Sequence, residues 1–492
     1  MNWFRNNLPQ AVPAPSRFRN PIGKYRLHRS KVCIACGRCV EVCPYHVHEM
    51  KRGRALTRHA YRCVGTDCPT PCYQECPVNA LSLRRNPTFD TLGDFRWPPD
   101  LLVSTWHMAE TGAVPPGGLE YRIGSSAGGF DKLRLQLPPV DTQSRDDDVD
   151  VGLELNRRQD NAHKIKISVP FYGGGMSYGS VSITTMLSRI KAAAALNTFC
   201  CTGEGGYPDE LKPYDDHVIT QVATGLFGVR EETIQRVRIV EFKYAQGAKP
   251  GLGGHLLGDK VTPGVARMRE AVMGYPLFSP FPFHSVYSVE DHKKHVDWVK
   301  AVNPQALVSV KVSTPTDVDM VAVGSYYAGA HIIHLDGSYG GTGAAPDIAK
   351  KNIAMPIEYA VPKVHRFLQE EGVRDKITVI ASGGIRTPHD VAKIIALGAD
   401  GVCTGTADLV ALECIRCHNC ESGRGCARGI ATTDSELMGL IDLEWGTQRI
   451  INMFLAWRGE LVGILKRLRM KSITELVGRT DCLVHLDYMK KE

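Results

Sequence analysis

The sequence predicts an α/β protein built on a (β/α)8 barrel, a TIM barrel, with a small cysteine-rich domain before it and helices after it. From about residue 164, short apolar runs rich in β-branched residues alternate with helix-like stretches, which is typical of parallel strands covered by helices. Residues 31–85 contain eight cysteines and few aliphatic residues. Such a segment cannot build an apolar core, so a metal framework is expected to hold it.

In chain order, the sequence divides into five parts. Residues 1–30 are rich in proline and arginine and are expected to form an extended arm. Residues 31–85 form the cysteine-rich domain, and residues 86–163 form a connector rich in proline and glycine. Residues 164–433 form the barrel. Residues 434–492, which include an amphipathic stretch, are expected to form C-terminal helices that pack against it.

Eight apolar runs account for the strands of the barrel. They begin at Ile165, Asn197, His217, Val237, Ala306, His331, Ile377 and Asp400. Helix-like stretches lie between them, such as MLSRIKAAAAL before the second run and PHDVAKIIALGA before the last. An open, doubly wound sheet would show the same alternation, but a count of eight favours the closed barrel.

Composition narrows the class of protein. The net charge of +7 comes from 59 Lys and Arg against 52 Asp and Glu, and no basic tract with interleaved aromatics is present. We therefore expect no nucleic-acid partner, although a mildly basic face would suit an acidic electron-transfer partner. The sequence has no apolar run of about 18 residues and no secretory signal, so no membrane association is expected. Clustered cysteines in such a chain indicate metal sites in a reducing, cytoplasmic compartment.

The N-terminal cysteines form two consecutive runs, each ending in Cys-Pro. The first is Cys33-Ile-Ala-Cys36-Gly-Arg-Cys39-Val-Glu-Val-Cys43, and the second, with wider gaps, contains Cys63, Cys68, Cys72 and Cys76. The pattern looks like a bacterial-type ferredoxin module with two [4Fe–4S] clusters, in which the last cysteine of each run binds the neighbouring cluster. Cys33, Cys36, Cys39 and Cys76 would hold one cluster, and Cys63, Cys68, Cys72 and Cys43 the other. Zinc knuckles have overlapping spacings, but two runs ending in Cys-Pro argue against zinc.

Glycine-rich turns follow the last two predicted strands, where a barrel binds phosphate. Gly383 and Gly384 follow the seventh strand, and Gly405 and Thr406 follow the eighth. Isolated glycines are usually only turns, but this pair of turns in this order predicts a phosphate-bearing cofactor. Lys311 lies near the carboxyl end of an apolar strand. It is expected to face the site and stabilise negative charge on a reduced cofactor or a substrate carboxylate, rather than only reach solvent.

Several segments resemble the FMN-binding domain of glutamate synthases. They are Thr202–Gly206, Gln221–Val229, Glu241–Gly251, Tyr287–Asp291, Asp336–Gly343 and Cys426–Thr432, in collinear order over residues 165–485. With the ferredoxin-like runs in front, the whole chain resembles the archaeal-type glutamate synthase subunit. The resemblance implies that FMN is bound. It also implies that 2-oxoglutarate and ammonia form 2-iminoglutarate, which reduced FMN converts to L-glutamate.

The resemblance also implies which residues act. Lys249 and Arg269 would pair with the two carboxylates of 2-oxoglutarate, and Glu204 would orient or deprotonate the amine. His255 stands where relatives with a fused glutaminase have Gln; His can still donate a hydrogen bond, and this departure bears on recognition of the distal carboxylate. The full prediction for substrate binding is Lys249, His255, Arg269, Gly341 and Thr342, with Glu204 and Lys311 as further catalytic residues. For the cofactor it is Met176, Ser177, Gln221, Lys311, Gly383, Gly384, Gly405 and Thr406.

A third cysteine group contains Cys414, Cys417, Cys420 and Cys426. By resemblance, Cys414, Cys420 and Cys426 would bind a [3Fe–4S] cluster beside the flavin. All four thiolates suit a [4Fe–4S] cluster instead, and the extra thiolate favours four ligands. The remaining cysteines, Cys200, Cys201, Cys403 and Cys482, are expected to be buried small residues.

The predicted electron path runs from an external donor through the N-terminal clusters and the third cluster to FMN. No Gly-x-Gly-x-x-Gly element, which would bind a dinucleotide, follows a strand. The electron donor is therefore expected to be a separate NAD(P)H-oxidising or ferredoxin-type subunit. Ammonia is expected from solution or from a separate glutaminase, and the protein is expected to be part of an oligomer. One alternative is an N-alkylglutamate synthase, such as an N-methylglutamate synthase, which uses methylamine. Another is a non-catalytic electron-transfer subunit, against which the intact Glu204, Lys249, Lys311 and Arg269 argue.

Overall fold

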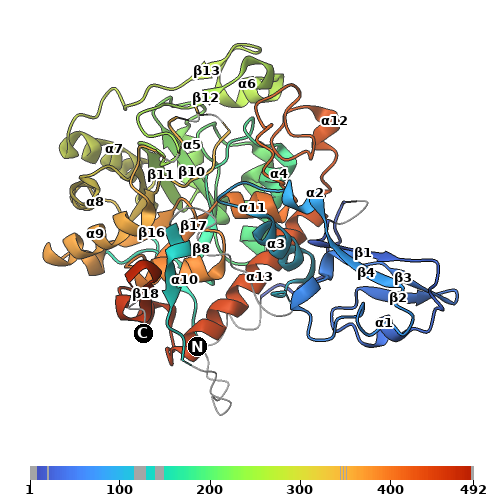
Figure 1. Ribbon diagram of the computed structural model, residues 1–492. Helices are drawn as coiled ribbons and strands as arrows, with labels where there is room; N and C mark the ends of the chain where they lie inside the picture. The colour runs from blue at the N-terminus through green and yellow to red at the C-terminus, as the bar shows by residue number, and fades with distance from the viewer. Residues whose placement is uncertain are drawn as a thin grey trace.

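The computed structural model describes residues 8–18, 22–115, 129–138, 149–343, 345–346, 348–350 and 352–488. A closed barrel of eight parallel strands occupies the centre, and a small cysteine-rich module projects from one side (Figure 1). The barrel strands are β8 (Phe171–Gly173), β9 (Cys200–Cys201), β10 (Val218–Ala223), β11 (Ile239–Lys243), β14 (Leu307–Ser313), β15 (Ile332–Asp336), β16 (Thr378–Ser382) and β17 (Gly401–Thr404). Strand β17 pairs with β8 and closes the barrel. The predicted fold class is confirmed.

The first barrel strand differs from the sequence prediction. The run from Ile165 forms β7 (Lys166–Ile167), which pairs antiparallel with β6 (Leu153–Glu154) outside the barrel sheet. Ile165 and Ile167 pack in one apolar cluster with interior side chains of the barrel strands, including Ile332. The run is therefore apolar because it closes the amino-terminal end of the barrel, and the first barrel strand begins only at Phe171.

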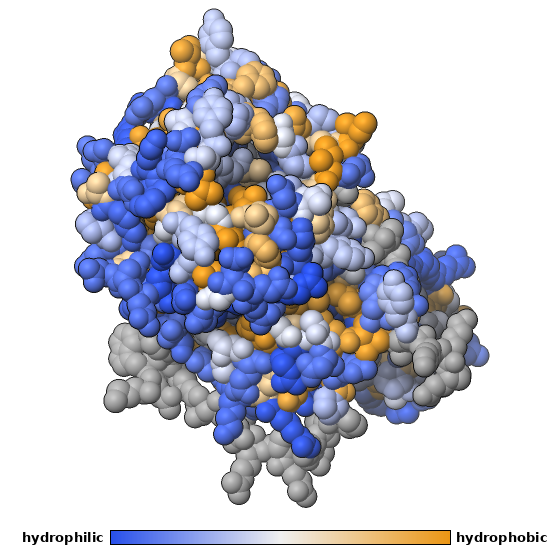
Figure 2. Space-filling view, turned by 90° about the vertical axis from the view of Figure 1, so that its left-hand side faces the viewer, coloured by the Kyte–Doolittle hydropathy of each residue, from blue (hydrophilic) through white to orange (hydrophobic). Residues whose placement is uncertain are grey.

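Helices cover the outside of the barrel. They are α4 (Ile183–Ala195), α5 (Glu231–Arg236), α7 (Val289–Val302), α8 (Val318–Tyr327), α9 (Ile357–Glu370), α10 (Pro388–Ala396) and α11 (Thr406–Ala411), with the 3₁₀ segments η5 (Asp209–His217) and η7 (Arg374–Lys376). Ser182, Ser288 and Thr387 begin their helices as N-caps, since each side chain accepts a backbone N–H of the first turn. The face that includes α7, α8 and α9 is largely hydrophilic, with scattered apolar side chains (Figure 2).

An insertion of residues 244–288 joins β11 to α7. It contains β12 (His255–Leu256), η6 (Gly258–Lys260), α6 (Pro263–Arg269) and β13 (Leu277–Phe278). Figure 1 shows β12, β13 and α6 beyond the ends of β10 and β11, at the top of the view. Because β11 is parallel to its neighbours, this insertion starts at the carboxyl end of the barrel, where barrel enzymes place their active sites.

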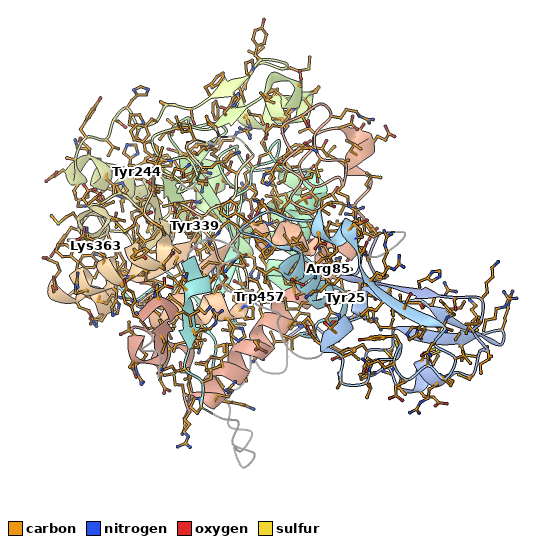
Figure 3. The ribbon with its side chains drawn as sticks, viewed as in Figure 1. Tyr25, Arg85, Tyr244, Tyr339, Lys363 and Trp457 are labelled. Atoms are coloured by element: carbon orange, nitrogen blue, oxygen red, sulfur yellow. The ribbon has the colours of Figure 1, made fainter. Side chains whose placement is uncertain are left out.

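The cysteine-rich module contains two short antiparallel pairs. Strand β1 (Tyr25–Arg29) pairs with β4 (Leu81–Arg85), and β2 (His48–Lys51) pairs with β3 (Arg54–Thr57). The other elements are α1 (Arg38–Glu41), η2 (Ala60–Arg62) and η3 (Gly65–Asp67). Tyr25 and Arg85 are register partners at the side where the module joins the rest of the chain (Figure 3).

The segments around the barrel are tied into its helical layer. The region expected as a connector contains α2 (Pro87–Asp90), α3 (Pro99–Thr111), η4 (Gly129–Lys132) and β5 (Leu133–Leu135), and α3 packs against α11 and α13. The C-terminal part contains α12 (Ser435–Met438), α13 (Leu443–Arg467), η8 (Ile473–Leu476), η9 (Thr480–Cys482), β18 (Leu483–His485), which pairs with β5, and η10 (Leu486–Tyr488).

Helix α13 joins several distant parts of the chain. Trp457 of this helix is fully buried and packs against Phe171 of the first barrel strand (Figure 3). The N-terminal arm runs beside α13, since Asn452 Nδ2 donates to the Val12 carbonyl at 2.8 Å. Within the described ranges, no helix has an apolar stretch of the length that a membrane span requires.

Candidate functional site

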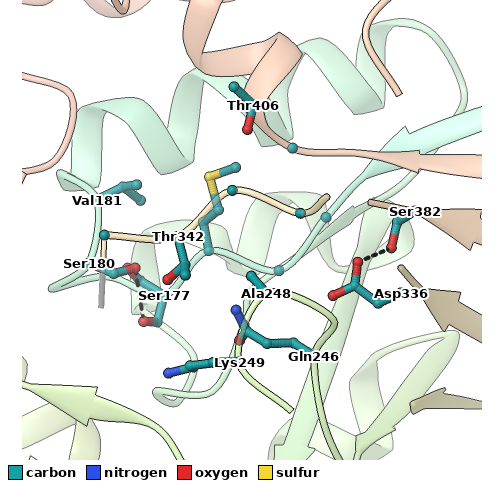
Figure 4. A pocket seen from close by; sticks show the side chains of 18 of the residues that line it. Ser177, Ser180, Val181, Gln246, Ala248, Lys249, Asp336, Thr342, Ser382 and Thr406 are labelled. Carbon is teal, nitrogen blue, oxygen red and sulfur yellow. Dashed lines mark hydrogen bonds between the residues drawn. The ribbon is translucent and has the colours of Figure 1, made fainter. Parts of the chain in front are cut away.

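One cavity lies at the carboxyl ends of the barrel strands, and Figure 4 shows it from close by. The loops after most of the strands contribute to its wall, together with the insertion after β11 and the third cysteine group. All the barrel residues predicted for substrate or cofactor line it: Met176, Ser177, Glu204, Gln221, Lys249, His255, Arg269, Lys311, Gly341, Thr342, Gly383, Gly384, Gly405 and Thr406. The fold therefore brings these residues together, while the role assigned to each remains a prediction.

Glycine backbone forms one part of the cavity wall. Gly383 has a φ of 94°, in the left-handed region, and a Cβ there would lie 2.4 Å from the Gly337 carbonyl oxygen. At Gly405, a Cβ would meet only Met176 Cε, at 3.6 Å, so this position leaves room in the cavity. Glycine backbone in the cavity wall at the ends of β16 and β17 fits a phosphate group, which backbone N–H groups can bind closely.

Cationic side chains gather elsewhere on the wall, around one carboxylate. Lys243 Nζ lies 3.3 Å from Glu204 Oε2, and Lys249 Nζ donates to the Gly253 carbonyl at 3.2 Å. Arg269 Nη2 donates to Ser177 Oγ at 2.9 Å, while its buried Nε has no hydrogen-bond partner among the described residues. Lys243, Lys249 and Arg269 outnumber Glu204, and the more distant Glu421 is paired with Lys260, so this region is positive, which suits a ligand with two carboxylates.

Burial makes these cations costly without an anion. It lowers the pKa of Arg269 to about 10, although Glu204 opposes the shift. Burial and the nearby Lys243 lower the pKa of Lys249, against the opposing charges of Glu204 and Glu421. Arg269 stays a cation at neutral pH, so a bound anion would offset part of the desolvation cost of this region.

His255 takes a position on the rim. It belongs to β12 of the insertion, is exposed, and stacks on the ring of Phe278 with centroids 4.7 Å apart. Its ring therefore lines the mouth of the cavity on a short antiparallel pair and not on a barrel strand.

Further residues line the cavity that the sequence analysis did not select: Lys243, Gln246, Asp336, Tyr339, Ser382, Arg416 and Glu421. Lys243, Asp336 and Ser382 each end an apolar barrel strand. Lys311 was selected because polar residues near the carboxyl ends of barrel strands face the active site, and the same reasoning would have selected these three. Arg416 and Glu421 lie within the third cysteine group, which the family resemblance placed beside the flavin, but no local pattern indicates that these two side chains reach the cavity.

The N-terminal cysteines fall into two spatial groups. Cys33, Cys36, Cys39 and Cys76 line one small cavity, which matches the grouping expected from the two runs. In the other group, burial raises the pKa of Cys72 to about 12, and the nearby thiols of Cys63, Cys43 and Cys68, together with Cys39 of the first group, add to this shift. Thiols this close cannot all ionise unless positive charge lies between them, as a bound iron–sulfur core would supply.

The third cysteine group borders the main cavity. Cys414 and Cys420 line it, Cys417 is exposed, and Cys426 lies near both cavity-lining thiols. Burial raises the pKa of Cys414 to about 11, and Cys420 and Cys426 contribute. Lys260 of the insertion donates to the Cys420 carbonyl at 2.9 Å and pairs with Glu421 at 3.1 Å, which fixes this loop against the cavity. Throughout the described ranges, no three His, Cys, Asp or Glu side chains are arranged to hold a single metal ion.

The remaining cysteines behave as expected from the sequence. Cys200, Cys201, Cys403 and Cys482 are all buried. Cys200 and Cys201 lie on β9 and Cys403 on β17, inside the barrel wall. They lie outside the three cysteine groups.

The fold and the site define a barrel enzyme whose cavity has a positively charged region and is bordered by cysteines. Residues 136–471 match the model of a protein family described as the conserved region in glutamate synthase. The archaeal-type glutamate synthase (NADPH) of Thermotoga maritima is 36% identical over 477 residues, covering 92% of each chain. The archaeal glutamate synthase (NADPH) of Methanocaldococcus jannaschii is 35% identical over 496 residues, covering 94% of each. The chain belongs to the glutamate synthase family and is a glutamate synthase-type oxidoreductase, as its sequence motifs indicated.

A longer relative matches only part of this chain. The glutamate synthase (NADPH) large chain of Azospirillum brasilense is 36% identical over 326 residues, which cover 64% of this chain and 21% of the large chain.

Proposed function

We propose that this protein binds FMN in the barrel cavity and reductively aminates 2-oxoglutarate with ammonia, through 2-iminoglutarate, to L-glutamate. The observation that carries the proposal is that one cavity joins a glycine-lined wall, a positive region and the third cysteine group. These three parts match the three needs of the reaction, which are a phosphate-bearing cofactor, a dicarboxylate substrate and a supply of electrons.

The cofactor assignment rests on the fit of the wall. Gly383, Gly384, Gly405 and Thr406 would hold the phosphate with backbone groups, and Met176, Ser177, Gln221 and Lys311 would line the rest of the group. Bound FMN would accept single electrons and deliver them as a hydride. Burial opposes the charge on Lys311, but Asp336 and Glu241 raise its pKa above the ordinary value, so the chain places a stable cation at this wall.

The substrate would bind in the positive region. Lys249 and Arg269 would hold the carboxylates of 2-oxoglutarate, with Gly341, Thr342 and His255 completing the contacts. The Glu204 carboxylate, held by Lys243, would orient the amine and accept its proton. The insertion that carries Lys249 and Arg269 would limit the access of water to this region.

We further propose that the cysteines carry the electrons. Cys33, Cys36, Cys39 and Cys76 would bind one [4Fe–4S] cluster, and Cys43, Cys63, Cys68 and Cys72 the other. Cys414, Cys417, Cys420 and Cys426 would bind a third cluster, [4Fe–4S] or, with three ligands, [3Fe–4S]. In this scheme residues 31–85 relay electrons, residues 164–433 carry out the chemistry, and residues 1–30, 86–163 and 434–492 hold the two together.

The partners follow from this division. Electrons would come from an NAD(P)H-oxidising or ferredoxin-type subunit, and ammonia from solution or a glutaminase subunit, within a cytoplasmic oligomer. The relatives named above carry NADPH in their names, which supports a donor that is reduced by NADPH.

The direct test is anaerobic mixing of the reduced protein with substrate. The flavin absorbance is followed after 2-oxoglutarate and ammonium are added together and separately. Rapid reoxidation with L-glutamate formed only when both are present is the expected result. Reoxidation with methylamine but not with ammonium would replace the proposal with an N-methylglutamate synthase. Failure with every amine, including in the presence of a glutaminase, would leave an electron-transfer role.

A further inference from the structure

A continuous chain of buried polar side chains runs beneath the cavity. Gln221 Nε2 lies 2.7 Å from Glu241 Oε1, Glu241 Oε2 lies 3.0 Å from His334 Nδ1, and His334 Nε2 lies 2.8 Å from Ser382 Oγ. Ser382 Oγ lies 2.6 Å from Asp336 Oδ1, and Asp336 Oδ2 lies 3.6 Å from Lys311 Nζ. Figure 4 shows the Ser382–Asp336 contact at the cavity wall. These six residues come from five neighbouring strands, β10, β11, β14, β15 and β16.

Two members of this chain, Glu241 and His334, do not line the cavity. Gln221, Lys311, Asp336 and Ser382 line it, whereas Glu241 and His334 lie below, each 1% exposed. The side chains that would meet a ligand are therefore supported by a second layer that the mechanism above does not use.

Counting protons along the chain defines the state of the histidine. Lys311 Nζ and the Gly247 N–H both approach the Asp336 carboxylate. Burial acts to raise the pKa of Asp336, but the Lys311 cation lowers it below its ordinary value. Asp336 is therefore ionised and only accepts hydrogen bonds. Ser382 has a single hydroxyl hydrogen and donates it to Asp336. Its oxygen must then accept from His334, which requires a hydrogen on His334 Nε2.

The other ring nitrogen faces a carboxylate. Glu241 Oε2 also accepts from Ser309 Oγ at 3.1 Å, and Glu241 Oε1 accepts from Gln221 Nε2. Burial acts to raise the pKa of Glu241, but His334, Lys311 and Gln221 lower it to about 2. Independently of His334, Gln221 and Ser309 each donate to one of the two Glu241 oxygens and the Lys311 cation lies nearby, so Glu241 is ionised and only accepts. This requires a hydrogen on His334 Nδ1 as well.

The charges in this layer then balance. Lys311 and His334 are cations, and Asp336 and Glu241 are anions. Three other titratable groups face the same interior from β8, β9 and β17, namely Tyr172, Cys201 and Cys403. Burial raises the pKa of each well above its ordinary value, so they remain neutral and the two pairs compensate each other.

We propose that His334 and Glu241 form a buried imidazolium–carboxylate pair that positions the floor of the cofactor site. The pair turns the Gln221 amide so that its NH₂ faces Glu241 and its carbonyl is left for the bound group. Through Ser382 it holds Asp336 and so Lys311 at the cavity wall. His334 is thus a positioning residue whose charge favours extra negative charge on the bound cofactor. The inference rests on the proposed function, since FMN is the cofactor in question.

The protonation state can be measured without FMN. In protein labelled with ¹⁵N-histidine at neutral pH, the signals that disappear in His334→Gln belong to this ring. Two protonated nitrogens are expected in the wild type, and only one in Glu241→Gln, where the anion is lost. A wild-type ring with one bare nitrogen would overturn the proposal. If His334→Gln does not fold, Ser382→Ala identifies the ring by shifting its Nε2 signal.

The positioning role is measured on the bound flavin. Loss of the His334 cation leaves an unbalanced Glu241, so His334→Gln should bind reduced FMN at least tenfold less tightly relative to oxidised FMN. For a two-electron couple this lowers the midpoint potential by about 30 mV. The matched control is His331→Gln. His331 immediately precedes β15, is also fully buried, and its Nε2 lies 2.8 Å from Asp160 Oδ2. Its midpoint potential should equal that of the wild type.

The outcomes separate the two proposals. A wild-type protein that binds no FMN contradicts the proposed function, while the histidine spectrum still decides the ion pair. A protein that binds FMN with the same midpoint potential in His334→Gln and wild type contradicts the positioning role alone.

Discussion

The cysteine-rich module and the barrel are stable for different reasons. The buried apolar cluster of the module consists of Cys39, Ala55, Cys72 and Leu81, so half of it is cysteine. In the barrel, every residue of β10, β14, β15 and β16 is buried. The barrel therefore has a large core of its own, with apolar clusters around a buried polar network, whereas the module depends on what its thiols bind. One chain thus combines a fold fixed by its core with a fold fixed by its ligands.

The largest expected effect is the loss of the module's structure when iron is removed. Structural metal binding contributes on the order of 10 kcal/mol in small metal-dependent domains, more than a core of this size supplies. Anaerobic chelation should expose residues 31–85 to proteolysis while the barrel up to the third cysteine group, residues 164–411, stays resistant. Equal protease resistance of the module before and after chelation would refute the comparison.

A control for this experiment is Cys200→Ser. Cys200 is buried on β9 and lies outside the cysteine groups. The variant should keep the full iron content, whereas Cys39→Ser should lose iron from the module.

The next largest effect tests the barrel. Ile332 is fully buried at the amino-terminal end of β15, so Ile332→Ala should destabilise the barrel by about 2–5 kcal/mol through lost burial and a cavity. Urea unfolding followed by circular dichroism measures the change. Ile353→Ala is the control, because Ile353 is 63% exposed and should change stability by less than about 0.5 kcal/mol. Iron loss from the module in Ile332→Ala would show that the two regions are not independent.

A smaller effect is expected when the chemistry of the barrel is changed without its fold. Arg269→Ala should weaken 2-oxoglutarate binding by about 1.5–3 kcal/mol, roughly 10- to 150-fold, because it removes charge-assisted hydrogen bonds. FMN content and iron content should stay unchanged. Arg267→Ala is the matched control, since Arg267 is exposed on the same helix α6. Equal affinities in the two variants, measured by titration, would remove Arg269 from the site.

The smallest effect concerns surface charge in the module. Arg38 pairs with Glu75 at 3.0 Å, and both side chains are about half exposed. Glu75→Gln should change stability by at most about 1 kcal/mol, because solvent screens such pairs. A larger change in the thermal unfolding of the module would mean that ion pairs, and not only the clusters, hold it together.

Much of this architecture could be predicted because it is periodic in the sequence. The alternating apolar runs predicted the barrel, and cysteine spacing predicted the group of Cys33, Cys36, Cys39 and Cys76, which meet across about 40 residues. The first strand was misplaced because β7, which closes the barrel end, has the same apolar composition as a barrel strand. Burial dictates composition in both places, so composition cannot separate them.

The site was partly predictable for a related reason. Active-site residues of such barrels lie at the carboxyl ends of the strands, which is where the glycines after β16 and β17 and Lys311 of β14 were found. Lys243 and Asp336 lie at strand ends of the same kind. Arg416 and Glu421 depend instead on a long loop being held against the cavity, which Lys260 achieves from more than 150 residues away. Such a contact leaves no local sequence pattern, and only the family resemblance placed the third cysteine group beside the cofactor. The pairing of His334 with Glu241 across the barrel is likewise visible only once the strands are closed.

The pairing of β1 with β4 has a consequence for how such a protein is assembled from parts. The chain leaves the arm at Lys24 and returns at Asn86, whose N–H donates to the Lys24 carbonyl at 3.0 Å. Both ends of the module therefore meet at one point, and a few residues could close the gap if the module were absent. The module therefore has the connectivity of an inserted domain, whose entry and exit strands lie side by side.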